Sequence, residues 1–385
     1  MVEKRPLRVV YVNHVARCSG AELSLLSLLR ALRERGVEVH ALVPEGDLAE
    51  RLRALDLPVS LLPERRLRRT ANPFSLASQY RWLREVRHRA LALCQETQAD
   101  LVHANSLAVA VALAQRGPAL PPLIWHCRDL LAPPVAVRWL APRCAGIIAI
   151  SHVVEHMLGQ AAPSRARTAV IHNGLQPEDL RLSRDPQAVR QELGIETAAP
   201  LVVTVGQLTS WKRVELALEA AELLRPRHPE LRWGIVGEAL FPEDAAYAEK
   251  LRSSAPPNVV FTGYRPDAAD LVRAADLLAH PATAEAFGRV VLEAMALGTA
   301  CVAARAGGVP ELLEHEVSGW LVEPGNAETL AAGVERLLED PPLRQRLAQA
   351  AQVRAREFFS ADRTADRTAA FYQYLLSAKA ADKCE

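Results

Sequence analysis

The chain has 385 residues, more than the roughly 250–300 at which one hydrophobic core usually stops growing, so we expect two domains. Half of the residues are hydrophobic and 24% are charged, an ordinary globular balance, so we expect disorder only at the ends. The formal net charge is +1, but residues 1–178 carry +8 and residues 179–385 carry −7. No apolar stretch approaches the ~20 residues of a membrane-spanning helix, and the amino terminus has only a short β-like run where a signal peptide would have a longer apolar one.

In the first half, short β-branched runs alternate with longer helical patterns, which is typical of a parallel sheet flanked by helices. This pattern predicts one doubly wound Rossmann-like α/β domain over residues 1–178. We expect strands at 7–13, 38–43, 101–104, 123–126 and 146–150, and helices at about 21–34 and 74–97.

A polar, proline-containing stretch at 176–187 lacks sustained periodicity and is typical of a linker. A second alternating series follows it and predicts another Rossmann-like domain over residues 188–358. The expected strands are 201–205, 231–236, 259–261, 277–280, 300–303 and 319–321, and the expected helices are 211–224, 242–253, 267–274, 289–296, 327–338 and 361–376.

The cysteines indicate neither a metal site nor a disulfide framework. Their spacing includes no C-x-x-C pair and no nearby histidine pair of the zinc-finger kind. This usage, with no signal peptide, predicts a reducing cytoplasmic location. The six residues are Cys18, Cys94, Cys127, Cys144, Cys301 and Cys384.

Two carboxylates surround a small-residue turn that leads into a predicted helix. Glu285 precedes Phe287 and Gly288, where glycine allows the backbone to approach a ligand closely, and Glu293 lies within the apolar periodicity of the helix. Because the N–H groups at a helix start favour an anion, this turn predicts a phosphate beside Gly288 and Arg289, with the carboxylates left to bind hydroxyl groups. Taken singly, each acid could instead be a surface or dipole-compensating residue, but their joint spacing favours a site.

Two further candidates follow predicted strands. Lys212 comes after a short loop that begins at Gly206, so its ammonium could point at a diphosphate, although a solvated lysine in a first helical turn is the simpler alternative. His126 ends an apolar strand, an edge where α/β proteins bind ligands, although a lone histidine there is more often structural. Asp129, three residues later, could orient that imidazole or contact an acceptor.

Together these motifs resemble the donor-site signature of the retaining family 4 glycosyltransferases, also called glycosyl transferases group 1. Glu285 and Glu293 are separated by seven residues, and an Ala/Gly-rich tail that ends in GGVPELL follows. Further motifs match in the family's order along nearly the whole chain: Gly20-Ala21-Glu22, His126 in WHCRD, IAIS ending at Ser151, IHNG at Asn173 and Gly174, VGQLTSWK from Gly206 to Lys212, and FTGY near Gly263.

The resemblance implies the GT-B architecture, in which two doubly wound domains face each other across a cleft. The first would be the acceptor side, the second would bind the nucleotide sugar, and the last helix at 361–376 would pack back on the first. Glu285 would contact hydroxyls of the donor sugar, Glu293 the nucleotide ribose, and Lys212 the pyrophosphate. The catalytic candidates are Glu285, His126 and Asp129, and the other donor-site candidates are Gly20, Gly206, Gln207, Arg213, Phe287, Gly288, Arg289 and Asn173.

One position departs from the family pattern. The family usually has Arg directly after the glycine of the VG motif, but this chain has Gln207. Losing that guanidinium removes a bidentate phosphate contact, so either Arg213 or Arg289 supplies the charge or donor binding is weaker.

A basic segment at 51–89 combines ten arginines with three acids and several apolar residues. It could be a solvated surface, a nucleic-acid patch or an attachment to an anionic membrane. No nucleic-acid motif accompanies it, and the apolar residues favour the membrane surface. The arginines are residues 51, 53, 65, 66, 68, 69, 81, 84, 87 and 89, and the apolar residues include Leu67, Phe74, Leu76, Tyr80, Trp82 and Leu83.

The resemblance therefore predicts a retaining transfer of a sugar from a UDP- or GDP-linked donor to a sugar or lipid-linked hydroxyl acceptor, in making a surface polysaccharide or glycolipid. No metal or other cofactor is expected, because this architecture commonly relies on lysine and helix dipoles at the diphosphate. Nucleic acid is not an expected partner, and contact with the inner face of the plasma membrane is. The alternatives are a non-hydrolysing nucleotide-sugar epimerase and a catalytically silent nucleotide-sugar-binding subunit.

Overall fold

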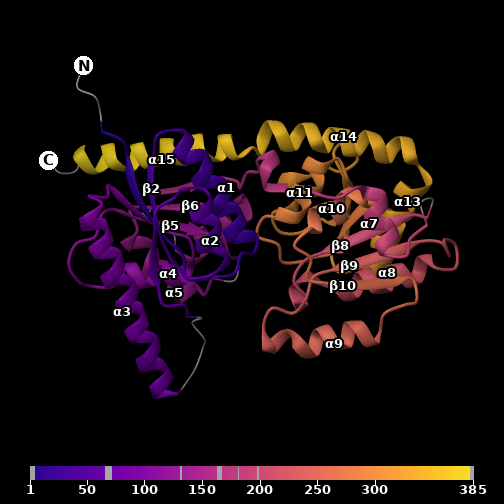
Figure 1. The fold of residues 1–385 in the computed structure, drawn as a ribbon, viewed down its shortest axis with the longest axis horizontal. Coiled ribbons are helices and arrows are strands. Elements are labelled where there is room, and N and C mark those ends of the chain that lie inside the picture. The colour runs from indigo at the N-terminus through magenta and orange to yellow at the C-terminus, as the bar shows by residue number, and fades with distance from the viewer. Residues whose placement is uncertain are drawn as a thin grey trace. The chain divides into compact units, whose positions relative to one another are not determined.

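The computed structural model describes residues 5–65, 72–130, 132–162, 167–180, 182–196 and 199–381. The chain divides into two compact units (Figure 1). The first unit comprises Met1–Gly174 together with Ala361–Glu385, and the second comprises Leu175–Ser360. Each unit is a parallel sheet flanked by helices, so the predicted fold class of two Rossmann-like domains is confirmed.

The sheet of the first unit has seven strands in the order β3-β2-β1-β4-β5-β6-β7, and neighbouring strands pair in parallel. Its central strands are buried along nearly their whole length, which explains why they read as continuous apolar runs. The strands are β1 (Arg8–Val12), β2 (Glu38–Pro44), β3 (Val59–Leu62), β4 (Leu101–Ala104), β5 (Leu123–Cys127), β6 (Gly146–Ala149) and β7 (Arg167–Val170).

Several of the helices that connect these strands begin at side-chain caps. Asn72, Ser106 and Ser151 each accept a hydrogen bond from a backbone N–H of the helix that they precede. The helices are α1 (Gly20–Glu34), α2 (Asp47–Ala54), α3 (Pro73–Glu96), α4 (Leu107–Leu113), α5 (Pro134–Leu140) and α6 (His152–Ala161).

A helix from the far end of the chain completes the first unit. This helix, α15 (Ala361–Ala381), packs along α1 and lies so close to β6 that a Cβ on Gly146 would be 2.6 Å from Leu375 Cδ1. Its Tyr372 is fully buried, and Arg35 of α1 pairs with Asp366 at 2.5 Å. The core of the first unit therefore contains residues from both ends of the sequence.

The second unit has a six-stranded sheet in the order β10-β9-β8-β11-β12-β13, again with parallel pairing. Its strands are β8 (Leu201–Val205), β9 (Arg232–Val236), β10 (Val259–Gly263), β11 (Leu277–His280), β12 (Ala300–Ala304) and β13 (Trp320–Val322). Its helices are α7 (Pro186–Glu192), α8 (Val214–Leu224), α9 (Ala245–Ser253), α10 (Ala268–Ala274), α11 (Arg289–Leu297), α12 (Val309–Leu312), α13 (Ala327–Glu339) and α14 (Pro341–Phe358).

The stretch that we predicted as a linker is partly structured. It contains a short 3-10 helix at Pro177–Leu180 and the start of α7, whose N-cap Asp185 accepts hydrogen bonds from the N–H groups of Gln187 and Ala188. Elements this short do not span enough turns to show a helical period in the sequence.

Candidate functional site

Loops from three neighbouring strands meet at one edge of the second sheet. Because β8, β11 and β12 are parallel, their carboxyl ends lie at the same edge, which is where open α/β sheets bind ligands. The loop after β8 carries Gly206, Gln207 and Lys212, and the loop after β11 carries Glu285 and leads into α11.

A lysine, a carboxylate and a histidine form the centre of this site. The Lys212 ammonium lies 2.5 Å from Glu285 Oε2, and His280 Nε2 lies 3.3 Å from the same oxygen. The stem of Lys212 crosses Gly206, where an added Cβ would be 3.7 Å from Lys212 Cε. His280 ends β11 and is buried, so the strand itself positions it.

The ionisation of Glu285 depends on its cationic neighbour. Burial opposes the charged form, but the Lys212 charge and the His280 ring outweigh it and hold the pKa of Glu285 well below its usual range. Burial lowers the pKa of His280 despite the nearby carboxylate. At neutral pH the cluster is therefore a Lys–Glu ion pair beside a neutral imidazole.

Two glycines fix the backbone of Glu285. Gly307 has φ +56°, and a Cβ there would be 2.0 Å from the Glu285 carbonyl oxygen. The Gly308 N–H donates to that same oxygen at 2.8 Å. The glycine pair after β12 thus allows two backbone segments to touch directly, which side chains at these positions would prevent.

The start of α11 lies just beyond Glu285. Its N-cap is Gly288, which has φ +97° and no side chain to cap the helix, and the preceding Phe287 is buried in the core. Arg289 is the first residue of the helix, and its Nε donates at 2.8 Å to Oε1 of Glu293, which lies one turn further along. An uncapped helix start beside a cation and a carboxylate suits a phosphorylated, hydroxylated ligand.

Gln207, the residue that departs from the family pattern, makes a hydrogen bond within the second unit. Gln207 Nε2 donates to Asp244 Oδ2 at 3.3 Å. Of the two arginines considered as substitutes, Arg213 has a left-handed backbone (φ +51°) and binds Glu215 at 2.5 Å, while Arg289 binds Glu293. Arg289 follows the helix N-cap directly and is thus the better placed for an anion at that helix start.

In the first unit, His126 lies in β5 and is part of a buried polar cluster. Its Nδ1 is 3.1 Å from His103 Nε2 and 3.4 Å from Arg128 Nη2. Its Nε2 is buried and has no hydrogen-bond partner among the described residues. Asp129 is exposed, and no hydrogen bond or ion pair joins it to His126 in the described part of the chain. The orienting contact that we considered for Asp129 is made by His103 instead.

Asn173 belongs to the same buried cluster. Arg128 donates to Asn173 Oδ1 at 2.7 Å and to Asn105 Oδ1 at 2.8 Å, so both asparagines hold the guanidinium beside the imidazoles. Gly20 is the first residue of α1, and its neighbour Glu22 accepts from the backbone and the hydroxyl of Ser19. Glu22 is thus engaged in capping α1.

Several arginines of the basic segment at 51–89 have acidic or carbonyl partners within the first unit. Arg51, Arg53 and Arg89 pair with Asp47, Glu45 and Glu85 respectively, and Arg87 donates to the carbonyls of Leu113 and Pro118. Arg66, Leu67, Arg68 and Arg69 lie outside the described residues.

Trp82, which we included in the interfacial surface, is buried and donates to the Pro63 carbonyl. Phe74, Leu76 and Tyr80 are exposed on the amino-terminal half of α3, which extends away from the sheet of the first unit (Figure 1).

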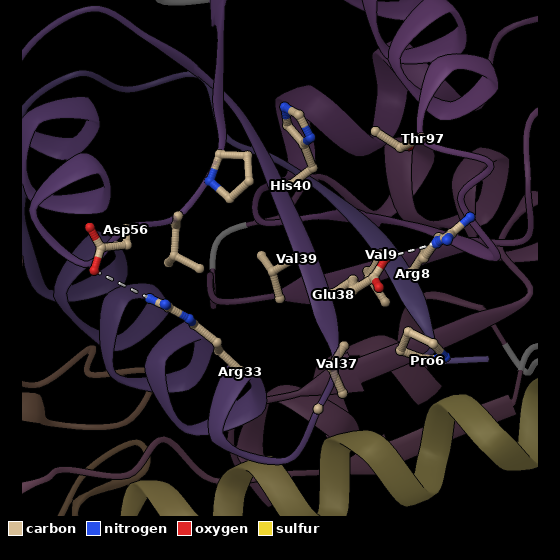
Figure 2. A pocket seen from close by; sticks show the side chains of 13 residues that line it. Pro6, Arg8, Val9, Arg33, Val37, Glu38, Val39, His40, Asp56 and Thr97 are labelled. Carbon is tan, nitrogen blue, oxygen red and sulfur yellow. Dashed lines mark hydrogen bonds and ion pairs between the residues drawn. The ribbon is translucent and has the colours of Figure 1, made fainter. Parts of the chain in front are cut away.

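A cavity of about 550 Å³ lies in the first unit at the amino ends of β1 and β2. Figure 2 shows Arg33 directed towards Asp56 and Arg8 beside Glu38, and both arginines are thus paired. The cavity adjoins the carboxyl ends of α1 and α2, which disfavour anions, so it is unsuited to a phosphate. It also lies at the opposite strand ends from His126.

Two family models match this chain in succession. The model described as Glycosyltransferase Family 4 matches residues 18–179, and the model described as Glycosyl transferases group 1 matches residues 185–354. Their order and joint coverage decide the family. The chain belongs to the family 4 glycosyltransferases of GT-B type.

This family 4 chain is similar to curated glycosyltransferases from several organisms. It is 38% identical over 200 residues to a D-inositol 3-phosphate glycosyltransferase of Segniliparus rotundus, covering 50% of this chain and 44% of the relative. It is 28% identical over 368 residues to the sulfoquinovosyl transferase SQD2 of Arabidopsis thaliana, covering 88% and 67%. The chain spans about half the length of the first of these curated relatives.

Among solved structures, the family 4 chain resembles Anabaena Alr3699/HepE in complex with UDP and glucose. The TM-score is 0.79 and the identity is 27%, over 96% of this chain and 100% of the other. In the part of the chain that the structure describes, no helix is both long and apolar enough to cross a membrane.

The sequence pattern of this family 4 member did not identify several residues of the two clusters, the one around Glu285 and the one around His126. His103 is the next-to-last residue of β4, His280 ends β11, and Arg128 follows β5. A polar residue at the carboxyl end of an otherwise apolar buried strand was the available signal, since burial of such a group requires partners. Tyr372 carried no such signal, because its partner lies 269 residues away.

Proposed function

We propose that this chain is a retaining glycosyltransferase that moves a sugar from a nucleotide diphosphate to a hydroxyl acceptor. The observation that carries the proposal is the Lys212–Glu285–His280 cluster, whose Glu285 lies three residues before the N-cap of α11. Lys212 and the helix start would bind the diphosphate, and Glu285 would bind the sugar hydroxyls. Glu293, one turn into α11, would bind the ribose.

The structural relatives support a nucleotide-sugar donor. Anabaena Alr3699/HepE was solved with UDP, with UDP and glucose, and with UDP-glucose. We extend that ligand class to this chain, with a UDP- or GDP-linked sugar as the donor and no metal or other cofactor at the diphosphate. The lysine would supply the positive charge that a bridging metal supplies elsewhere.

For the chemical step we propose displacement on the same face of the sugar, guided by the leaving phosphate. Glu285 carries its negative charge at neutral pH and would stabilise positive charge that develops on the sugar ring. The Lys212 ammonium would stabilise the leaving diphosphate. NMR of the product tests this step, because it must show the anomeric configuration of the donor, and inversion would contradict it.

Calorimetric titration with UDP, GDP, ADP, TDP and CMP tests the donor site. We expect one diphosphate to bind selectively and to bind more weakly to the Lys212→Ala and Glu293→Ala variants. Absence of binding to all five would instead favour a catalytically silent subunit that lost its donor site at Gln207. If UDP-sugar were bound and epimerised without transfer, the epimerase alternative would hold.

The acceptor that we propose is a sugar or lipid-linked hydroxyl at an anionic membrane, as needed for a surface polysaccharide or glycolipid. Phe74 is 84% exposed, and Leu76 and Tyr80 lie on the same half of α3. Exposed apolar residues on a basic helix favour the membrane–water interface. Sedimentation with phosphatidylglycerol vesicles should recover the protein, and Phe74→Ser should weaken recovery. The matched control is Val353→Ser, which removes an exposed apolar residue from α14 of the second unit.

A further inference from the structure

The buried cluster around His126 determines which of its ring nitrogens carries the proton. Four side chains form one continuous line of contacts: the Tyr11 hydroxyl contacts the Tyr372 hydroxyl, which lies 2.6 Å from His103 Nδ1, and His103 Nε2 lies 3.1 Å from His126 Nδ1. All four are buried, so water does not supply alternative partners. The line ends at His126 Nε2, which has no hydrogen-bond partner among the described residues.

The hydrogen bonds along this line can be donated in either of two directions. Burial and the Arg128 charge lower the pKa of both imidazoles well below its usual value, so each ring is neutral and carries one proton. In one direction each group donates towards His126, whose Nε2 then carries a hydrogen. In the other direction each group donates towards Tyr11, and His126 Nε2 is then a bare acceptor.

Arg128 favours one of these directions but does not fix it alone, because its contact with His126 Nδ1 is longer than the contacts of His103 with His126 and with Tyr372. Its Nη2 lies 3.4 Å from His126 Nδ1, and a guanidinium has only donors. A protonated Nδ1 would direct its N–H at this cation, whereas a lone pair there is attracted by it. The guanidinium itself is fixed, because it donates to Asn105 at 2.8 Å and to Asn173 at 2.7 Å.

We propose that Tyr372 and His103 are positioning residues that hold His126 in its Nε2–H tautomer and so make it a hydrogen-bond donor to an oxygen of the sugar substrate. Tyr11 donates to Tyr372, Tyr372 to His103 Nδ1, and His103 Nε2–H to His126 Nδ1. The buried, unpartnered Nε2–H of His126 then has an acceptor only when ligand binds. This role rests on the proposed glycosyl transfer, but the tautomer itself does not.

The tautomer can be measured on the intact protein without any substrate. Long-range ¹H–¹⁵N spectra of protein labelled at histidine distinguish Nε2–H from Nδ1–H rings, and loss of one signal set in His126→Gln assigns the residue. We expect His126 as the neutral Nε2–H form at pH 7.5. An Nδ1–H ring or an imidazolium at that pH would overturn the proposal.

Two substitutions at His103 distinguish the effect of hydrogen-bond direction from the effect of side-chain packing. His103→Gln keeps an N–H donor for His126 and an acceptor for Tyr372, whereas His103→Leu fills the space and offers neither. We expect the Gln variant to keep the Nε2–H form and to release UDP from UDP-glucose within about threefold of the wild-type kcat. We expect the Leu variant to show both tautomers and a kcat lower by roughly tenfold, as for a lost neutral hydrogen bond, with little change in KM. Equal behaviour of the two variants would overturn the positioning role.

A second matched pair remains informative if a His103 variant does not fold. Tyr372→Phe removes the donor to His103 Nδ1, whereas Tyr11→Phe removes a hydroxyl from the same cluster but leaves that donor in place. The proposal requires mixed His126 tautomers only in Tyr372→Phe, and a uniform tautomer in both variants would contradict it. Failure of wild-type protein to bind or turn over any UDP- or GDP-linked sugar, with the Nε2–H form present, would count against the proposed function and not against the tautomer.

Discussion

The Lys212 ammonium lies 2.5 Å from the Glu285 carboxylate, although 73 residues separate them in the sequence. Lys212 comes from the loop after β8 and Glu285 from the loop after β11, so the contact depends on the adjacency of these two strands in the sheet. In the absence of ligand each residue neutralises the other. A diphosphate that approaches Lys212 would therefore share its charge with Glu285.

We expect Lys212→Ala to weaken UDP binding by roughly 10-fold to 100-fold, the range of a charge-assisted hydrogen bond of about 1.5–3 kcal/mol. The same change should raise the pKa of Glu285, because it removes the cation that offsets burial. Calorimetry at pH 7.5 measures the first effect. Lys250→Ala is the control, since Lys250 is exposed on α9. Equal loss in both variants would show a general charge effect and not a site.

Glu293→Ala should distinguish ribose from phosphate recognition. We expect weaker binding of UDP, by roughly tenfold or more, and unchanged binding of inorganic pyrophosphate, because only the ribose offers hydroxyls to this carboxylate. Competition calorimetry measures both ligands, with Glu328→Ala on the exposed start of α13 as the control. A parallel loss of pyrophosphate binding would instead assign Glu293 to holding Arg289 in place.

Gly307→Ala should damage the proposed donor site more than its backbone conformation alone explains. Gly307 and Gly325 both have positive φ, +56° and +78°, so alanine at either position costs about 1–2 kcal/mol of strain. Only at Gly307 would the Cβ meet the Glu285 carbonyl, at 2.0 Å, whereas nothing lies within 4 Å at Gly325. Urea unfolding should show a larger loss of stability for Gly307→Ala than for Gly325→Ala, and calorimetry should show lost UDP binding for Gly307→Ala alone.

The buried imidazoles should make stability depend on pH between about 5 and 6.5. The pKa of His103 and of His126 is lowered in the folded protein, so below about pH 6.5 only the unfolded chain takes up these protons. Stability is therefore fully present above about pH 6.5 and falls as the pH decreases, by at most about 1.4 kcal/mol per pH unit for each imidazole. Unfolding temperatures across this range measure the slope, and His103→Gln should reduce it. An unchanged slope in that variant would mean that His103 is not buried as a neutral ring.

Gln207→Arg should strengthen diphosphate binding. The substitution restores the guanidinium that the family usually has, in the loop after β8 that also carries Lys212. We expect UDP affinity to rise by up to roughly tenfold, because Asp244, the present partner of Gln207, would compete for the new charge. No gain would indicate that Arg289 already supplies this contact, and Gln207→Arg in an Arg289→Ala background would then recover the affinity.

Much of the fold could be predicted because both sheets are buried and parallel. The strands at 101–104, 201–205 and 277–280 have the predicted bounds, since strands buried on both faces appear as uninterrupted apolar runs. Strands β3 and β7 were missed because they are the edges of the first sheet, are only partly buried and read as VSLL and RTAV. A sequence pattern does not distinguish such short mixed runs from loops.

The site was predictable where its residues lie in local motifs. Glu285, Gly288 and Glu293 are close in sequence, and the roles assigned to them remain predictions. The contacts of His126 with His103 and of Tyr372 with His103 depend on strand order and on α15, which a linear pattern does not contain. Trp82 was misjudged because its apolar neighbours on α3 are exposed while its own ring faces the core.

The return of α15 to the first unit also bears on how the protein is made. Residues 175–360, the whole of the second unit, lie between the two segments that build the first. During synthesis the second unit can fold before the ribosome has produced Tyr372, whereas the first unit must wait for α15 to fill its core and to complete the line of hydrogen bonds to His126. The group that we propose for substrate binding in the first unit is thus set only after the whole second unit has been synthesised, which makes its assembly a late step of biogenesis.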